Sequence, residues 1–122
     1  MITSSLEDYL EFIHNEISQE KNIKAIDIAN KFNVSRPTVS EALIKLADMD
    51  LIIYEGRRGI KITPKGMEQA KKTVKKHEIL SNFFTKILKI NSTLADKNAC
   101  KIEHVIDEEI IEKIETYTRS HE

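Results

Sequence analysis

A thiol, a carboxylate and an imidazole occur close together near the end of this 122-residue chain, as Cys100, Glu103 and His104. In an α-helix, residues three and four positions apart share a face, so these side chains can converge on one metal ion. Sulfur, nitrogen and oxygen ligands together favour a divalent transition metal over calcium or magnesium. The competing interpretation is structural, because a lone cysteine is most often a buried apolar residue.

The triplet belongs to the second of three helices that the apolar spacing predicts for the C-terminal half. The first is long and begins at Thr63-Pro64, the second runs from Ser92 through Val105, and Asp107 caps the third. Apolar side chains are expected to face inward at Val74, Leu80, Phe83, Phe84, Ile87, Leu88, Leu94, Ala95, Ala99, Ile102, Val105, Ile110, Ile111 and Ile114.

The N-terminal half predicts helices over residues about 4–19, 25–32 and 35–48, followed by two short strands, 52–55 and 59–63. The three residues between the strands, 56–58, predict a hairpin with glycine at its bend. Helix, helix, tight turn, helix and basic hairpin form a winged helix-turn-helix, which lays its third helix in the major groove of DNA. The alternative is a three-helix scaffold whose hairpin contacts another protein.

The third helix is expected to begin at Ser35 and to read DNA with exposed side chains near its start. Hydroxyl, guanidinium and carboxylate groups can reach base edges and phosphates, and proline can contact a thymine methyl group. Arginines at the tip of the hairpin are placed for phosphate or minor-groove contact. The expected DNA-binding residues are Ser35, Arg36, Pro37, Thr38, Ser40, Glu41, Arg57 and Arg58, whereas Val39, Leu43 and Leu46 are expected in the core.

The overall composition is that of a helix-rich protein, and no apolar run is long enough to span a bilayer. The net charge of -1 conceals a basic stripe, since residues 57–76 hold eight basic side chains and one acidic one. Such a stripe suits DNA, although a solvated helix face is the commoner explanation. One cysteine and a start that lacks the features of a signal peptide predict a cytoplasmic protein.

Several segments together resemble the metal-dependent transcriptional repressors of the DtxR/MntR type, over essentially the whole chain. The resemblance implies a winged-helix DNA-binding domain over residues 1–63 and an all-helical domain over 64–122 that binds metal and dimerises. It also implies the short architecture of the manganese branch, without the SH3-like domain of the iron branch. The segments are residues 6–11, 35–40, 51–55 with Gly59, 63–66, 76–78 and 100–105.

Carried over by position, the resemblance implies ligands on three helices. Asp8 and Glu11 match the first-helix carboxylates of the manganese branch, and His77 matches an imidazole of the long helix. Cys100 is the iron-branch form of a position that holds a carboxylate in the manganese branch. The resemblance implies one site made by Asp8, Cys100, Glu103 and His104, and a second one that uses Glu11 and His77 with help from Glu103.

One departure concerns the ancillary site of the iron branch. Ser81 and Asp96 stand where that branch has a carboxylate and an imidazole.

Helical wheels support the shared site independently, because Asp8 and Glu11 face away from the apolar stripe of their helix. Without metal the clustered carboxylates would repel, and a divalent cation reverses that effect.

The expected function is repression of metal-uptake and homeostasis genes by a homodimer that contacts operator DNA and pairs through its C-terminal helices. Mn²⁺ or Fe²⁺ is the expected signal, and Co²⁺ or Zn²⁺ is expected to bind in vitro. Metal would tie the first helix to the dimerisation domain and set the spacing of the reader helices. Alternatives are a winged-helix regulator that senses an organic ligand or nothing, and a metalloenzyme that uses an open coordination position.

Overall fold

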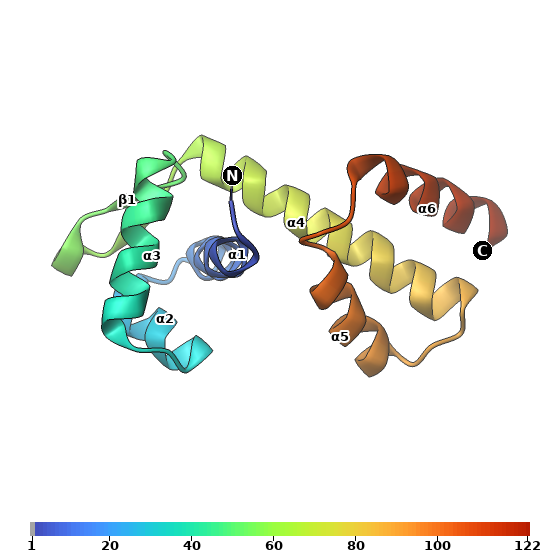
Figure 1. Cartoon of the computed structure of the whole chain (residues 1–122), viewed down its shortest axis with the longest axis horizontal. Helices are drawn as coiled ribbons and strands as arrows, with labels where there is room; N and C mark the ends of the chain where they lie inside the picture. Colours follow the sequence, from blue (N-terminus) through green and yellow to red (C-terminus); the bar gives the residue numbers. More distant parts are fainter. Residues whose placement is uncertain (1) are drawn as a thin grey trace. The chain divides into compact units, whose positions relative to one another are not determined.

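The helices and strands lie close to their predicted bounds in the computed structural model, which describes residues 2–122 (Figure 1). The fold is mainly α-helical with one two-stranded antiparallel sheet, which confirms the predicted fold class. The elements are α1 (Ser4–Ser18), α2 (Ala25–Phe32), α3 (Arg36–Asp48), β1 (Ile52–Tyr54), the 3-10 turn η1 (Gly56–Arg58), β2 (Ile60–Ile62), α4 (Pro64–Asn82), the π-helical turn η2 (Phe83–Ile87), α5 (Ser92–Ile102) and α6 (Glu108–His121).

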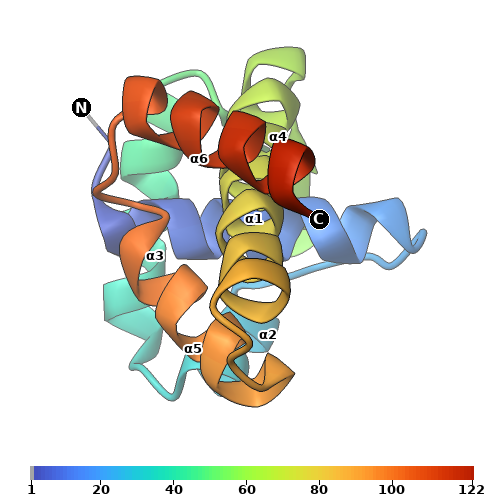
Figure 2. The same ribbon diagram turned by 90° about the vertical axis from the view of Figure 1, so that its right-hand side faces the viewer.

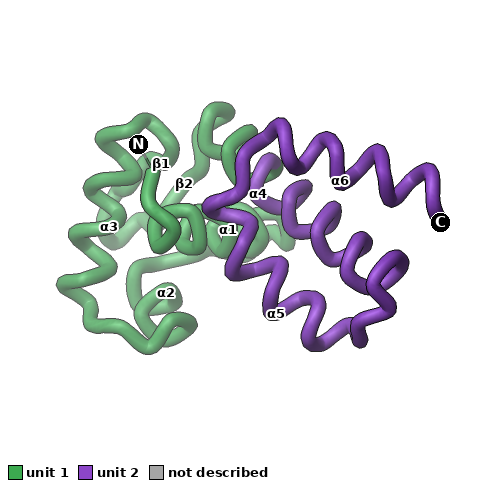
Figure 3. Tube along the Cα trace, turned by 45° about the vertical axis from the view of Figure 1, so that its right-hand side comes forward, with its two compact units in different colours: residues 1–71 green, residues 72–122 purple. Residues whose placement is uncertain are grey.

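The chain forms two compact units, one ending at Lys71 and the other running from Lys72 to Glu122 (Figure 3). The division falls inside α4, whereas the expected domain boundary between residues 63 and 64 is the start of that helix. The first turns of α4 therefore pack with the N-terminal unit, and the rest of the helix builds the C-terminal one.

The core of the N-terminal unit is formed by α1, α2, α3 and the sheet. Leu10, Ile13, Ile28, Leu43 and Leu46 have no exposed surface, and they come from the helical spacings that predicted these elements. Burial of side chains of this size contributes about 1.5–3 kcal/mol each, so this cluster holds α3 firmly against the unit.

Two residues fix the turn between α2 and α3. Asn33 ends α2 with a φ of 53°, a left-handed conformation that asparagine tolerates. The Ser35 hydroxyl accepts a hydrogen bond from the backbone N–H of Thr38 at 3.3 Å, which caps α3 as expected. The predicted helix-turn-helix is therefore present.

The hairpin pairs Ile52 with Ile62 and Tyr54 with Ile60. Gly59 is needed because its φ is 98° and a Cβ atom there would lie 2.7 Å from the Oδ1 atom of Asn22. Next to it, the Ile60 N–H donates to the Ile23 carbonyl at 3.1 Å, which ties the hairpin to the loop before α2. The wing is thus anchored to the helical part of its unit.

The C-terminal unit is built from the later turns of α4 with η2, α5 and α6. Figure 2 shows α5 and α6 beside α4, and both pack on η2. Ile79, Leu80, Ala99 and Ile111 form the buried cluster of this unit. Ala95 and Ala99 have no exposed surface, so the backbone of α5 can approach its neighbours closely.

Five expectations about this unit were wrong: the end of α5 and the burial of Leu88, Leu94, Val105 and Ile110. Leu88 directly follows η2 and is 51% exposed. α5 ends at Ile102 rather than Val105, because the chain turns there with the Val105 N–H bonded to the Ile102 carbonyl at 2.9 Å. Val105 therefore leaves the helix face and is 74% exposed, and Leu94 in the first turn of α5 is 47% exposed. Ile110 is also 47% exposed, since α6 directs Ile111 and Ile114 inward instead.

Candidate metal centre and DNA-binding face

Three potential ligands come together in the C-terminal unit: His77 from α4, Cys100 from α5 and Glu103 at the C-cap of α5. One imidazole nitrogen, the thiol sulfur and one carboxylate oxygen all lie within 4.8 Å of one another. Bonds of about 2.0–2.3 Å to one ion would require these three atoms to move closer together. The set of nitrogen, sulfur and oxygen donors therefore fits a divalent transition metal.

His104 adds a fourth donor beside this cluster. Its Nε2 atom lies 3.5 Å from Oε1 of Glu103, and the side chains of His104 and Glu103 are 5% and 1% exposed. A carboxylate so deeply buried is unfavourable unless cationic or hydrogen-bonding partners compensate for lost water. The two residues follow the end of α5, so the early end of that helix determines where they point.

His77 makes hydrogen bonds through both ring nitrogens. Nδ1 lies 2.8 Å from Oε2 of Glu103, and Nε2 lies 3.1 Å from Oδ1 of Asp96. The Ser81 hydroxyl donates to that same Oδ1 atom at 3.0 Å. His77 and Ser81 share a face of α4, and Asp96, Cys100 and Glu103 follow one line along α5, at spacings of four and three.

These contacts shift two pKa values in opposite directions. Burial lowers the pKa of His77, but its hydrogen bonds and charge attraction to Glu103 and Asp96 outweigh burial, so the pKa is raised above the ordinary value. The pKa of Asp96 is lowered, first by the hydrogen bond from Ser81 and then by that from His77. Both shifts favour a charged pair before any metal binds.

The structure brings together, within one unit, four of the predicted ligands: His77, Cys100, Glu103 and His104. It groups His77 directly with Cys100, whereas the resemblance implied His77 in a separate site with Glu11. The remaining two, Asp8 and Glu11, lie on α1 in the N-terminal unit, and both are half-buried.

The link from His77 to Asp96 and Ser81 was not predicted from the sequence. Sequence reasoning had noted these two positions only as departures from an ancillary site. The available signal was spacing, since Asp96 precedes Cys100 by four residues and Ser81 follows His77 by four.

The expected reader residues form the solvent side at the start of α3. Most of them are exposed, Ser40 is half-buried, and the Ser35 and Thr38 hydroxyls lie 2.8 Å apart. The predicted core positions Val39, Leu43 and Leu46 have no exposed surface. At the wing, Arg57 and Arg58 are exposed in η1.

Comparison with known families accounts for both halves of the chain. Residues 1–60 match the N-terminal DNA-binding domain of iron-dependent repressors, and residues 63–122 match their metal-binding and dimerisation domain.

The chain belongs to the iron-dependent repressor family. Members of this family are metal-dependent transcriptional repressors, and the winged helix and donor cluster lie in the corresponding halves of this member. The resemblance stated from the sequence is therefore confirmed.

Individual relatives are similar along most of this repressor. The transcriptional regulator MntR of Shouchella clausii is 36% identical, over 93% of this chain and 79% of its own. An HTH-type transcriptional regulator of Methanocaldococcus jannaschii is 33% identical, over 95% of this chain and 94% of its own.

Solved structures share the fold. The manganese regulator SloR superposes with a TM-score of 0.81 at 28% identity, over 93% of this chain. The metal-dependent regulator MtsR gives 0.84 at 26% identity, over 97% of this chain. This repressor spans only about half of these two proteins, 53% and 55% of their chains.

Among its described residues, no helix has both the length and the apolar character that crossing a bilayer requires.

Proposed function

We propose that this protein is a Mn²⁺- or Fe²⁺-dependent repressor of metal-uptake and homeostasis genes, which binds operator DNA as a homodimer in the cytoplasm. The observation that carries the proposal is the cluster of His77, Cys100 and Glu103 in the half of the chain related to metal-binding domains. We further propose that residues 1–63 act as the DNA-binding domain and residues 64–122 as the metal-binding and dimerisation domain.

The complete proposed ligand set adds residues outside the cluster. His104 lies beside Glu103, and the resemblance supplies Asp8 and Glu11 from α1. A bound divalent cation would supply positive charge that offsets the clustered carboxylates. The N-terminal carboxylates would then be attracted towards the ligands of the C-terminal unit, so that metal binding orders the reader helix.

Metal choice follows from ligand chemistry and from relatives. Carboxylate oxygens suit Mn²⁺ and Fe²⁺, whereas the Cys100 sulfur raises affinity for Fe²⁺, Co²⁺ and Zn²⁺. Relatives are named as manganese regulators, and the family is named for iron. We therefore propose Mn²⁺ or Fe²⁺ as the signal, with Co²⁺ or Zn²⁺ binding in vitro.

Operator contact is assigned to the start of α3 and the wing tip. Side chains from Ser35 to Glu41 have the donors and acceptors that reach base edges, and Arg57 and Arg58 can neutralise phosphates. A two-fold dimer binds a palindromic site tightly when its reader helices lie about 34 Å apart, or a multiple of it. Metal-dependent ordering of this spacing would couple the two sites by about 1–3 kcal/mol.

The homodimer surface is proposed on the C-terminal unit, where apolar side chains remain exposed. Leu88, Ile110 and Tyr117 are 51%, 47% and 49% exposed and line one groove between η2 and α6. Monomeric proteins rarely leave such apolar surface uncovered. A second copy is the occupant that the family's dimerisation domain supports. The groove is lined by Phe83, Ile87, Leu88, Ile110, Lys113, Ile114 and Tyr117.

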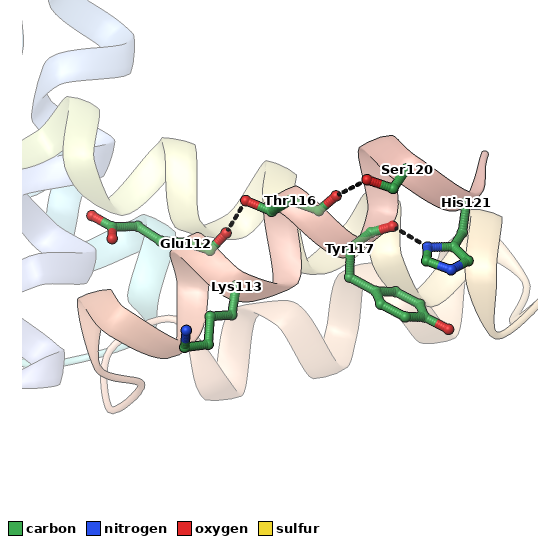
Figure 4. Close-up of a pocket in the computed structure, with 6 residues that line it drawn as sticks. All are labelled: Glu112, Lys113, Thr116, Tyr117, Ser120 and His121. Atoms are coloured by element: carbon green, nitrogen blue, oxygen red, sulfur yellow. Dashed lines mark hydrogen bonds between the residues drawn. The ribbon is translucent and has the colours of Figure 1, made fainter.

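A more polar hollow adjoins this groove along α6 (Figure 4). It shares Lys113 and Tyr117 with the groove, and the Tyr117 ring stacks on His121 with ring centres 3.9 Å apart. An apolar centre with a polar border is the usual composition of a protein interface.

The deciding experiment measures operator binding against buffered metal. DNA selected from a random library in the presence of Mn²⁺ would serve as the operator, with Mn²⁺, anaerobic Fe²⁺, Co²⁺ and Zn²⁺ titrated in turn. We expect wild-type binding to tighten about 5–150-fold with Mn²⁺ or Fe²⁺. Without metal, Cys100→Ala should bind DNA as tightly as wild type does. Its binding should increase less than that of wild type when Fe²⁺, Co²⁺ or Zn²⁺ is added.

Met67→Glu, in the first turns of α4 and not among the proposed ligands, serves as the control variant and should keep the wild-type response to metal. Operator binding that is the same in chelator and in every metal, for wild type, Asp8→Ala and Cys100→Ala alike, would refute the sensor. It would instead support the regulator that answers to an organic ligand or acts constitutively.

A further inference from the structure

Asp96 contacts the candidate metal centre without belonging to the donor cluster. Its Oδ1 atom accepts from Ser81 Oγ at 3.0 Å and lies 3.1 Å from Nε2 of His77. The other ring nitrogen, Nδ1, faces Glu103 at 2.8 Å. Asp96 and the cluster therefore lie on opposite edges of one imidazole ring.

The chemistry of a carboxylate determines which nitrogen of His77 carries a proton beside it. An ionised carboxylate can only accept hydrogen bonds, so the contact requires Nε2 to be the donor. Glu103 is also a carboxylate and lies 2.8 Å from Nδ1, so the metal-free ring carries a proton on each nitrogen. A metal ion held by Glu103 and Cys100 would displace the Nδ1 proton, and Nε2 would keep the proton that it donates to Asp96.

Ser81 holds the accepting oxygen in place. Its hydroxyl donates to the same Oδ1 atom that faces His77, so the carboxylate has little freedom to turn away. The Asp96 side chain is 66% exposed, and hydrogen-bonded ion pairs that are this exposed add little to folding stability. A small role in stability and a fixed geometry together indicate a role in orienting the ring.

We propose that Asp96, held by Ser81, is a positioning residue that keeps the proton of His77 on Nε2 and presents Nδ1 to the metal. The inference rests on the proposed metal site and extends it by two residues. Metal-bound histidines commonly donate their second N–H to a carboxylate, and removal of such a partner weakens metal binding about 10–100-fold.

Metal affinity provides the first test, measured on the full chain by chelator competition with Mn²⁺ and Co²⁺. Asp96→Ala should weaken binding about 10–100-fold. Ser81→Ala should weaken it less, and the double variant should lose no more than Asp96→Ala alone, because both residues act through one contact. Glu109→Gln, an exposed carboxylate of α6, is the matched charge control and should stay within about twofold of wild type.

The proton on the ring provides the second test, which a merely structural role would not satisfy. Nitrogen NMR of Zn²⁺-loaded protein should show metal on Nδ1 and a proton on Nε2 of His77, with weaker Nε2–H protection in Asp96→Asn. Metal on Nε2, or an affinity unchanged in Asp96→Ala, would overturn the positioning role. If wild type itself bound no metal, the proposed function would fail with it, so the two failures are distinguishable.

Discussion

At the scale of single residues, Cys100 would have the strongest effect on which metal the proposed site selects. It is exposed, whereas Glu103 beside it is buried, so the cluster combines a soft sulfur near solvent with a hard oxygen in the interior. A carboxylate at this position would favour Mn²⁺ more strongly, and the sulfur widens the range towards Fe²⁺ and Co²⁺. In the proposed site, this one side chain would therefore set the range of metals to which the protein responds.

His77 gives a pH prediction for the metal-free protein. Its pKa is raised above the ordinary value of about 6.5, because Glu103 and Asp96 favour the imidazolium. The resulting stabilisation is complete below the ordinary pKa and is lost as pH rises through the raised one. NMR titration of the His77 ring should show this raised pKa in wild type and a lower one in Asp96→Asn.

The free energy of unfolding should depend on pH in the direction that the raised pKa of His77 predicts. Urea unfolding of metal-free protein should show the His77 contribution near pH 6 and its loss at higher pH, while Glu109→Gln should leave the profile unchanged. Metal affinity should change in the opposite direction, because a protonated ring cannot bind a cation. A ring that titrates at its ordinary value in wild type would contradict the two hydrogen bonds.

At the scale of elements, the start of α4 depends on a close contact between backbones. The Thr63 hydroxyl accepts from the Gly66 N–H at 3.0 Å and donates to the Asp50 carbonyl at 2.7 Å. Gly66 lies so near Leu51 that a Cβ atom would clash with its carbonyl oxygen. This joint fixes where the long helix leaves the wing.

Gly66→Ala should therefore destabilise the protein although alanine favours helices. The gain in helix propensity is about 1 kcal/mol, and the forced backbone shift costs about 1–3 kcal/mol or more. Urea unfolding of metal-free protein should show a lower midpoint with an unchanged slope.

The hairpin glycine provides the comparison for this variant. Gly56 has open space around its Cα atom and a φ of 58°, which asparagine tolerates. Gly56→Asn should change stability by less than about 0.5 kcal/mol. Equal stability of Gly66→Ala and wild type would show that α4 can shift at this joint without loss.

Most elements could be predicted because their signals are local. Apolar periodicity, the Ser35 cap and the hairpin glycines indicated α1 to α4 and the wing within a residue or two. The end of α5 and the π-helical turn η2 depend on how α5 and α6 pack against α4, which spacing along the chain does not reveal. The link between Asp96 and His77 was missed for the same reason, since it requires the register between two helices.

At the scale of the whole molecule, the exposed apolar residues indicate the surface that a single copy of the chain does not bury. Expectations of burial were wrong at Leu88, Leu94, Val105 and Ile110, all in the C-terminal unit. The helical pattern selected these positions as apolar without distinguishing the interior of one chain from a surface that meets a second one. Their exposure thus supports the homodimer proposed for this unit.

Leu88→Glu and Tyr117→Glu should each separate the homodimer into monomers. A stable interface buries about 800 Å² per partner, and a charge at an anchor position typically costs at least about 2 kcal/mol, which raises the dimer dissociation constant about 30-fold. Light scattering during gel filtration measures the mass, and Met67→Glu is the matched change of an exposed apolar residue in the N-terminal unit. Operator affinity should fall when the dimer is lost, since a monomer reaches only one half-site. If both variants remained dimeric, the groove between η2 and α6 would not be the interface, and Leu94 and Val105 would mark the surface to test next.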